Sequence, residues 1–88
     1  MLGWLLLGAL ITAAVITICV SFLNKQVAKD KLRENNIKKG FIKEICKSSG
    51  IAHIKLDAID TDGNEQEVDI EADDYDENEI YEGMTIIA

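Results

Sequence analysis

The chain has no proline, one histidine and only two cysteines among its 88 residues. Cys19 and Cys46 form no CxxC pair and no cysteine–histidine ligand spacing, which argues against a zinc finger or a disulfide framework. There is no glycine-rich phosphate loop, and no serine lies in a nucleophile motif. His53 has no cysteine or aspartate at a useful spacing, so we interpret it as a surface histidine. We therefore predict that the protein is not an enzyme and that it has no catalytic residue, cofactor or metal ligand.

Basic residues are absent after Lys55, and this absence divides the chain by charge. All nine bases lie between Lys25 and Lys55, whereas all but three of the 16 acids lie between Asp57 and Glu82. A nucleic-acid interface needs a basic groove with stacking aromatic side chains, and the acidic half offers the opposite. We therefore predict no nucleic-acid partner.

The most prominent feature that is present is an uncharged run at residues 2–23. As a helix it would be about 33 Å long, enough to cross a bilayer core of about 30 Å. A buried helix of a soluble protein and a cleaved signal peptide are the alternatives. The rest of the chain is too small to surround a buried helix, and no base precedes the run. The sequence thus predicts one N-terminal transmembrane α-helix over residues 1–23.

The bases that follow this run predict its orientation, because Lys and Arg close to a span favour the cytoplasmic side. We expect a protein of the cell (inner) membrane with its N-terminus outside and its C-terminal domain in the cytoplasm. Residues 24–40 are predicted to form a helical connector that ends at Gly40 and is either solvated or in contact with anionic lipid. The membrane-proximal bases are Lys25, Lys29, Lys31, Arg33, Lys38 and Lys39.

Small residues recur every four positions in the predicted span and would line one side of a helix. Such a stripe lets membrane helices approach closely. We predict that it packs against another membrane protein or a second copy of the chain, which makes a homo-oligomer one of the alternatives. The stripe is Ala9, Ala13, Thr17 and Ser21.

From residue 41 the pattern alternates between apolar and polar residues, as in half-buried strands. Strands are expected at residues 41–47, 52–58, 66–72 and 84–88. A three-residue loop at 61–63 would place Leu56 opposite Val68, with Gly63 in a left-handed conformation. A two-residue loop would set Asp57 against Val68 instead. We predict the three-residue loop and, for residues 41–88, a small all-β barrel of four to five strands, of OB or SH3-like type.

The predicted barrel opens with Gly40-Phe41-Ile42 and closes with Glu82-Gly83-Met84-Thr85-Ile86-Ile87. This arrangement resembles the soluble domain of NfeD-like membrane proteins, whose OB-type barrel ends in a similar G-x-x-V-x-V strand. The resemblance covers about half of the chain. It implies an OB fold and a role beside stomatin-like scaffold proteins.

The acidic distal half offers two further candidate sites. Asp60, Asp62, Asn64 and Glu71 have the spacing of calcium-loop ligands, but Glu65 replaces the required glycine, so we expect a hairpin instead. The second candidate is a segment in which apolar side chains lie among acids, and we expect it to bind a basic protein partner. Its residues are Asp73, Asp74, Tyr75, Asp76, Glu77, Glu79, Ile80 and Tyr81.

These observations together predict a single-pass membrane adaptor or scaffold protein. Its cytoplasmic barrel would bind another protein, and its span would pack with other helices in the lipid. The alternative is a small membrane-active protein, phage- or toxin-like or regulating a pump or channel, in which the transmembrane segment carries the function.

Overall fold

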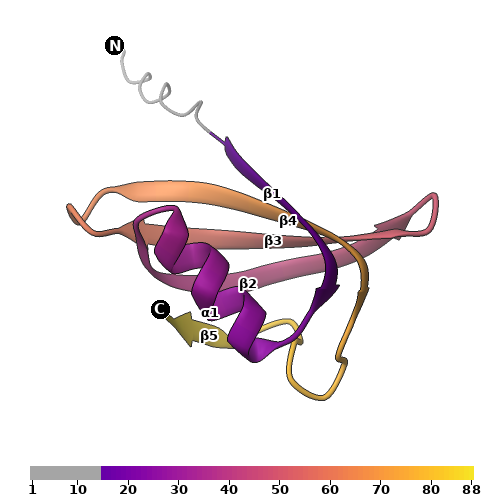
Figure 1. The fold of residues 1–88 in the computed structure, drawn as a ribbon. Coiled ribbons are helices and arrows are strands. Elements are labelled where there is room, and N and C mark those ends of the chain that lie inside the picture. Colours follow the sequence, from indigo (N-terminus) through magenta and orange to yellow (C-terminus); the bar gives the residue numbers. More distant parts are fainter. Residues whose placement is uncertain (1–14) are drawn as a thin grey trace, which may run out of the picture.

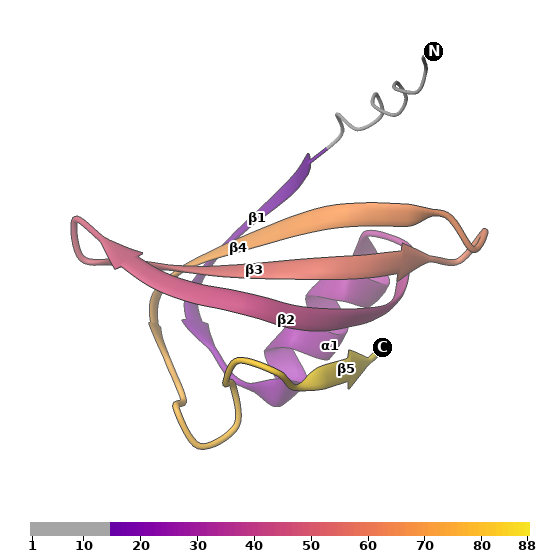
Figure 2. The same ribbon diagram turned by 180° about the vertical axis from the view of Figure 1, so that it is seen from behind.

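The computed structural model describes residues 15–88. Five strands form one mixed sheet in the order β1-β4-β3-β2-β5, with β1 parallel to β4 and all other neighbours antiparallel (Figure 1). A single helix crosses one face of this sheet, and the view from behind shows the other face without a covering element (Figure 2). The elements are β1 (Val15–Leu23), α1 (Lys25–Glu34), β2 (Ile37–Ser48), β3 (Ile51–Asp60), β4 (Glu65–Tyr75) and β5 (Thr85–Ile87).

The predicted transmembrane helix is wrong where the structure describes the chain, because residues 15–23 form strand β1. Five of its nine residues are β-branched, and such side chains fit a pleated surface better than a helix. Ile18 and Leu23 are buried in the core, and the strand pairs with β4 along most of its length. No helix within residues 15–88 is both long and apolar enough to cross a membrane. Residues 1–14 of the predicted span lie outside the described residues.

Helix α1 is a packed element of the domain, and it does not continue an upstream helix. Asn24 caps its start, since the Asn24 side chain accepts a hydrogen bond of 2.8 Å from the backbone N–H of Val27. Ala28 and Leu32 are buried against the sheet. The helix ends before Asn36, which has a φ of 61°, so the predicted helical stop at Gly40 is wrong.

Gly40 lies inside β2, beneath the helix. A Cβ atom at this position would lie 2.8 Å from Leu56 Cδ2 and 3.7 Å from Leu32 Cδ1. The missing side chain therefore leaves room for two leucines, one from the sheet and one from the helix.

The predicted hairpin register is confirmed. Leu56 lies opposite Val68 and Ile54 opposite Ile70 in the β3–β4 pair. The backbone N–H of Asp60 donates to the carbonyl of Asn64 at 2.9 Å, which closes the three-residue loop. Gly63 has a φ of +87°, the left-handed conformation that the loop requires.

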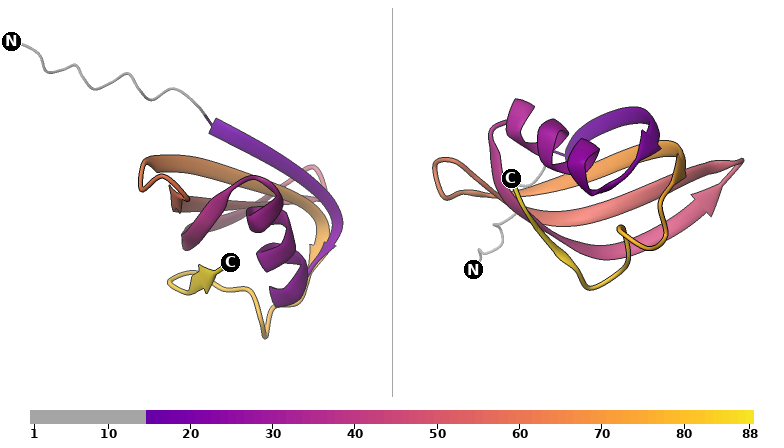
Figure 3. Two further views of the ribbon diagram at one scale, coloured as in Figure 1. Left: turned by 60° about the vertical axis from the view of Figure 1, so that its left-hand side comes forward. Right: turned by 60° about the horizontal axis from the view of Figure 1, so that its bottom comes forward.

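The predicted barrel is wrong, because the sheet is open in residues 15–88, with β1 and β5 at opposite edges. Strand β1 occupies the edge of β4, and β5 pairs only with residues 39–41 of β2. The curved sheet instead folds over α1, as the side view shows (Figure 3). The core therefore lies between the sheet and the helix, with Ile80, Met84 and Ile86 of the C-terminal segment closing its end.

Candidate metal centre

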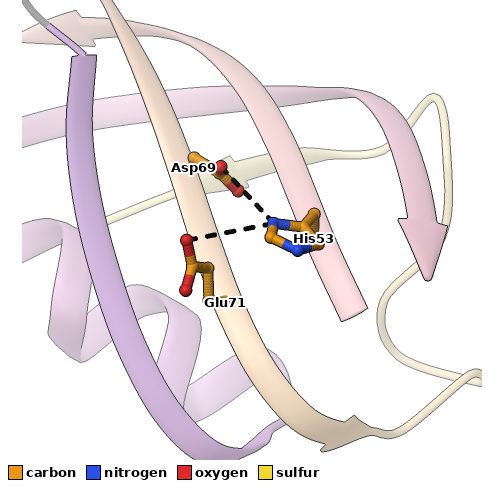
Figure 4. A group of neighbouring side chains, drawn as sticks. All are labelled: His53, Asp69 and Glu71. Carbon is orange, nitrogen blue, oxygen red and sulfur yellow. Dashed lines mark ion pairs between the residues drawn. The ribbon is translucent and has the colours of Figure 1, made fainter. Parts of the chain in front are cut away.

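The face of the sheet that points away from α1 brings together the only histidine and two acids. In β3 the side chains of Ile54 and Leu56 point into the core, so that of His53 points outward; in β4 the same alternation turns Asp69 and Glu71 outward. The register places His53 directly opposite Glu71, with Asp69 two residues along the same strand. The three side chains converge on one point between the two strands (Figure 4).

The spacing of these groups is wider than a hydrogen bond. His53 Nδ1 lies 3.6 Å from Asp69 Oδ2 and 3.9 Å from Glu71 Oε2, whereas an N–H···O hydrogen bond measures about 2.9 Å. One potential ligand atom from each residue lies within 4.8 Å of the other two. The three side chains are 25%, 22% and 33% exposed, respectively, so the group is partly withdrawn from water.

Asp69 carries a further unsatisfied group. Its Oδ1 atom is buried and has no hydrogen-bond partner in the described part of the chain. A buried acceptor without a partner is costly, by about 1–3 kcal/mol, and it is rare in native proteins. A cation bound beside this carboxylate would remove that cost.

A second acidic pair on the same face forms ion pairs with a lysine. Lys43 Nζ lies 2.9 Å from Asp57 Oδ1 and 3.3 Å from Glu67 Oε2. The hydrogen bond to Asp57, helped by that to Glu67, raises the pKa of Lys43 above its ordinary value against the opposing effect of burial. Lys55 lies in register with Asp69, but within residues 15–88 no ion pair joins it to an acid. The Asp69–Glu71 pair faces the imidazole of His53, and Glu71 Oε1 also accepts a long hydrogen bond of 4.0 Å from Cys19 Sγ.

The donor set suits a divalent transition metal. Imidazole nitrogen and carboxylate oxygen bind Zn²⁺ at about 2.1 Å, and two such ligands in tetrahedral geometry are about 3.4 Å apart. The two distances from His53 Nδ1, 3.6 and 3.9 Å, exceed this separation by only a few tenths of an ångström, and the two carboxylate oxygens lie within 4.8 Å of each other.

Sequence reasoning missed this cluster because the three residues meet across a strand pair. In the sequence, His53 has neither acid close enough to indicate a shared site, since Asp69 and Glu71 follow it by more than a strand and a loop. The signal that could have found the site is the hairpin register itself: once Ile54 faces Ile70, His53 must face Glu71.

The calcium-loop spacing forms a hairpin turn, as expected. Asp60 Oδ1 accepts hydrogen bonds of 2.9 Å from the backbone N–H groups of Asp62 and Asn64, and Oδ2 accepts one of 3.0 Å from Gln66 Nε2. These bonds, that from Asn64 foremost, lower the pKa of Asp60 below its ordinary value.

Only two of the four residues of the predicted helix-packing stripe lie in the part of the chain that the structure describes. Ala9 and Ala13 lie outside the described residues. Thr17 and Ser21 lie on β1, both exposed. The basic residues 25, 29, 31 and 33 lie on α1, and residues 38 and 39 lie on β2. Lys31 and Arg33 form exposed ion pairs of 3.6 Å with Glu34 and Asp30.

The predicted partner-binding segment spans the end of β4 and the connection to β5. Ile80 is buried in the core, and Glu79 Oε1 accepts a hydrogen bond of 3.1 Å from the backbone N–H of Lys25 at the start of α1. These two residues thus have roles inside the fold. Tyr81 is exposed, and binding of a basic partner to this segment stays a prediction.

No protein-family model, curated protein or solved structure matches the chain. The resemblance to NfeD-like proteins therefore stays a prediction.

Proposed function

We propose that this domain binds a divalent transition-metal ion through His53 Nδ1 and the carboxylates of Asp69 and Glu71. The observation that carries the proposal is the gap between the three groups. They converge on one point, yet they are too far apart to satisfy one another by hydrogen bonds.

The surroundings support the same proposal. The buried Oδ1 of Asp69 has no partner in the described residues, whereas the neighbouring acids Asp57 and Glu67 are already paired with Lys43. All three ligands project from the two central antiparallel strands β3 and β4, so the backbone holds them without a mobile loop. Ligands on rigid strands keep their geometry before the ion arrives.

Calorimetric titration of the full-length reduced chain with zinc chloride tests the proposal. We expect one ion per chain, and we expect His53→Ala, Asp69→Asn and Glu71→Gln each to weaken binding at least about tenfold. Saturation at a hundredfold excess over the dissociation constant should raise the melting temperature by about 10–20 °C. At the same zinc concentration, variants that bind tenfold more weakly should show about half of this rise or less.

Glu67→Gln is the matched control. Glu67 is an acid on the same strand and the same face, two residues from Asp69, but Lys43 already pairs with it. This variant should bind zinc as the wild type does. The proposal is wrong if the wild type binds neither Zn²⁺ nor Co²⁺, or if His53→Ala binds zinc as tightly as the wild type does.

A further inference from the structure

One thiol lies beside the metal centre, in the same row of residues. Cys19 of β1 pairs with Glu71 of β4, Glu71 with His53 of β3, and His53 with Cys46 of β2. The row therefore crosses four strands on the outer face, with a cysteine at each end. Both cysteines are free, Cys19 exposed and Cys46 half-buried.

The carboxylate of Glu71 lies between the imidazole and one of the thiols. Its Oε2 faces His53 Nδ1 at 3.9 Å, and its Oε1 lies 4.0 Å from Cys19 Sγ. His53 directs Nδ1 toward β4, which is the side of Cys19, and Cys46 lies on the opposite side, toward β2. Of the two thiols, Cys19 thus lies on the metal side of the histidine.

We infer that Cys19 is the fourth ligand of this centre and that the site therefore takes thiophilic ions of the zinc class in preference to Mg²⁺ or Ca²⁺. The inference rests on the proposed metal-binding function and adds the identity of the ion. Histidine, aspartate, glutamate and cysteine together supply the four ligands of a tetrahedral zinc site. A thiolate among them selects softer ions, because Mg²⁺ and Ca²⁺ prefer oxygen.

Cys19 Sγ lies outside the group of ligand atoms within 4.8 Å of one another, so binding the ion requires its side chain to rotate. Rotation of its side chain between staggered positions moves the sulfur by about 3 Å, and its exposed position leaves room for that rotation. The thiol loses its proton on binding, and the proton passes to solvent. The Zn²⁺–sulfur bond that forms is about 2.3 Å long.

Cobalt spectroscopy on the full-length reduced chain tests the inference, because Co²⁺ bound to a thiolate gives a near-ultraviolet charge-transfer band. We expect this band in the wild type and in Cys46→Ser, the matched control. Cys19→Ser should lose the band, keep the visible bands of bound Co²⁺, and bind zinc at least about tenfold more weakly. An excess of Mg²⁺ should not displace the ion from the wild type.

The outcomes separate this inference from the proposed function. If Co²⁺ binds to the wild type without a charge-transfer band, or if Cys19→Ser keeps the band, Cys19 is not a ligand, while the His53, Asp69 and Glu71 site stands. If no Co²⁺ binds at all, the proposed function fails and the inference fails with it. Circular dichroism of Cys19→Ser shows whether the variant is folded, and Cys19→Ala provides a second variant without an oxygen at this position.

Discussion

Replacement of Leu32 by alanine distinguishes a packed helix from a solvated one. The side chain of Leu32 is 0% exposed and points from α1 onto the sheet. Its Cδ1 atom lies 3.7 Å from the point where a Cβ atom on Gly40 would be. Removing a fully buried leucine side chain costs about 2–5 kcal/mol, which combines lost transfer free energy with the cavity left behind. A domain of this size has a total stability of about 4–11 kcal/mol. The substitution should therefore remove a large share of the free energy of unfolding, whereas a solvated connector helix would lose almost nothing.

Urea denaturation followed by circular dichroism measures this effect. We expect Leu32→Ala to lower the free energy of unfolding by about 3 kcal/mol and the melting temperature by about 12–24 °C. Arg33→Ala is the control, because Arg33 is the next residue along the helix and its side chain is exposed, with only a surface ion pair to Asp30. This variant should change the free energy of unfolding by less than about 0.5 kcal/mol. A loss below about 1 kcal/mol for Leu32→Ala would refute the packing of α1 on the sheet.

Two further predictions concern the β3–β4 loop. Gly63→Ala should destabilise the domain by about 1–2 kcal/mol in urea denaturation, because the left-handed φ of +87° is unfavourable for alanine. A steric clash does not contribute, since no atom lies within 4 Å of the new Cβ. Equal stability of the two proteins would contradict this prediction. The Asp60 carboxylate, whose pKa the hydrogen bond from Asn64 lowers in the folded state, contributes stability that is present above its ordinary pKa and is lost as the pH falls through its folded value. The difference in unfolding free energy between the wild type and Asp60→Ala should therefore shrink below about pH 4, and a constant difference down to the acid limit would count against the loop hydrogen bonds.

The sequence predicts the β3–β4 hairpin correctly because its determinants are local. Alternation sets which side chains face inward, and the loop at Gly63 permits one register that superimposes both apolar faces. Strands of alternating residues were likewise expected in β2 and β5, although β2 begins at Ile37, four residues earlier than expected.

The errors arise where the partner of a segment is remote in sequence. An uncharged run of apolar residues is compatible with a membrane helix or a buried strand, and hydropathy alone does not separate them. Residues 15–23 pair with residues 67–75, and no local pattern announces that pairing. Strand β1 also pairs with the edge of β4, and a barrel of residues 41–88 would have needed that edge in order to close. The cluster of His53, Asp69 and Glu71 escapes sequence reasoning for a related reason, since His53 meets the two acids only through strand pairing.

The order in which the strands can assemble follows from the β1–β4 pairing. Strands β2, β3 and β4 form a meander of neighbouring hairpins, so their contacts close short loops. Strand β1 leaves the ribosome first, yet it waits for β4, since Cys19 and Glu71 are 52 residues apart. During that interval the chain exposes a nine-residue strand without charge, which is the kind of segment that pairs with other chains. We expect β1 to stay without a partner until β4 has been synthesised, so capture of the nascent chain by a chaperone should decline once Tyr75 has emerged.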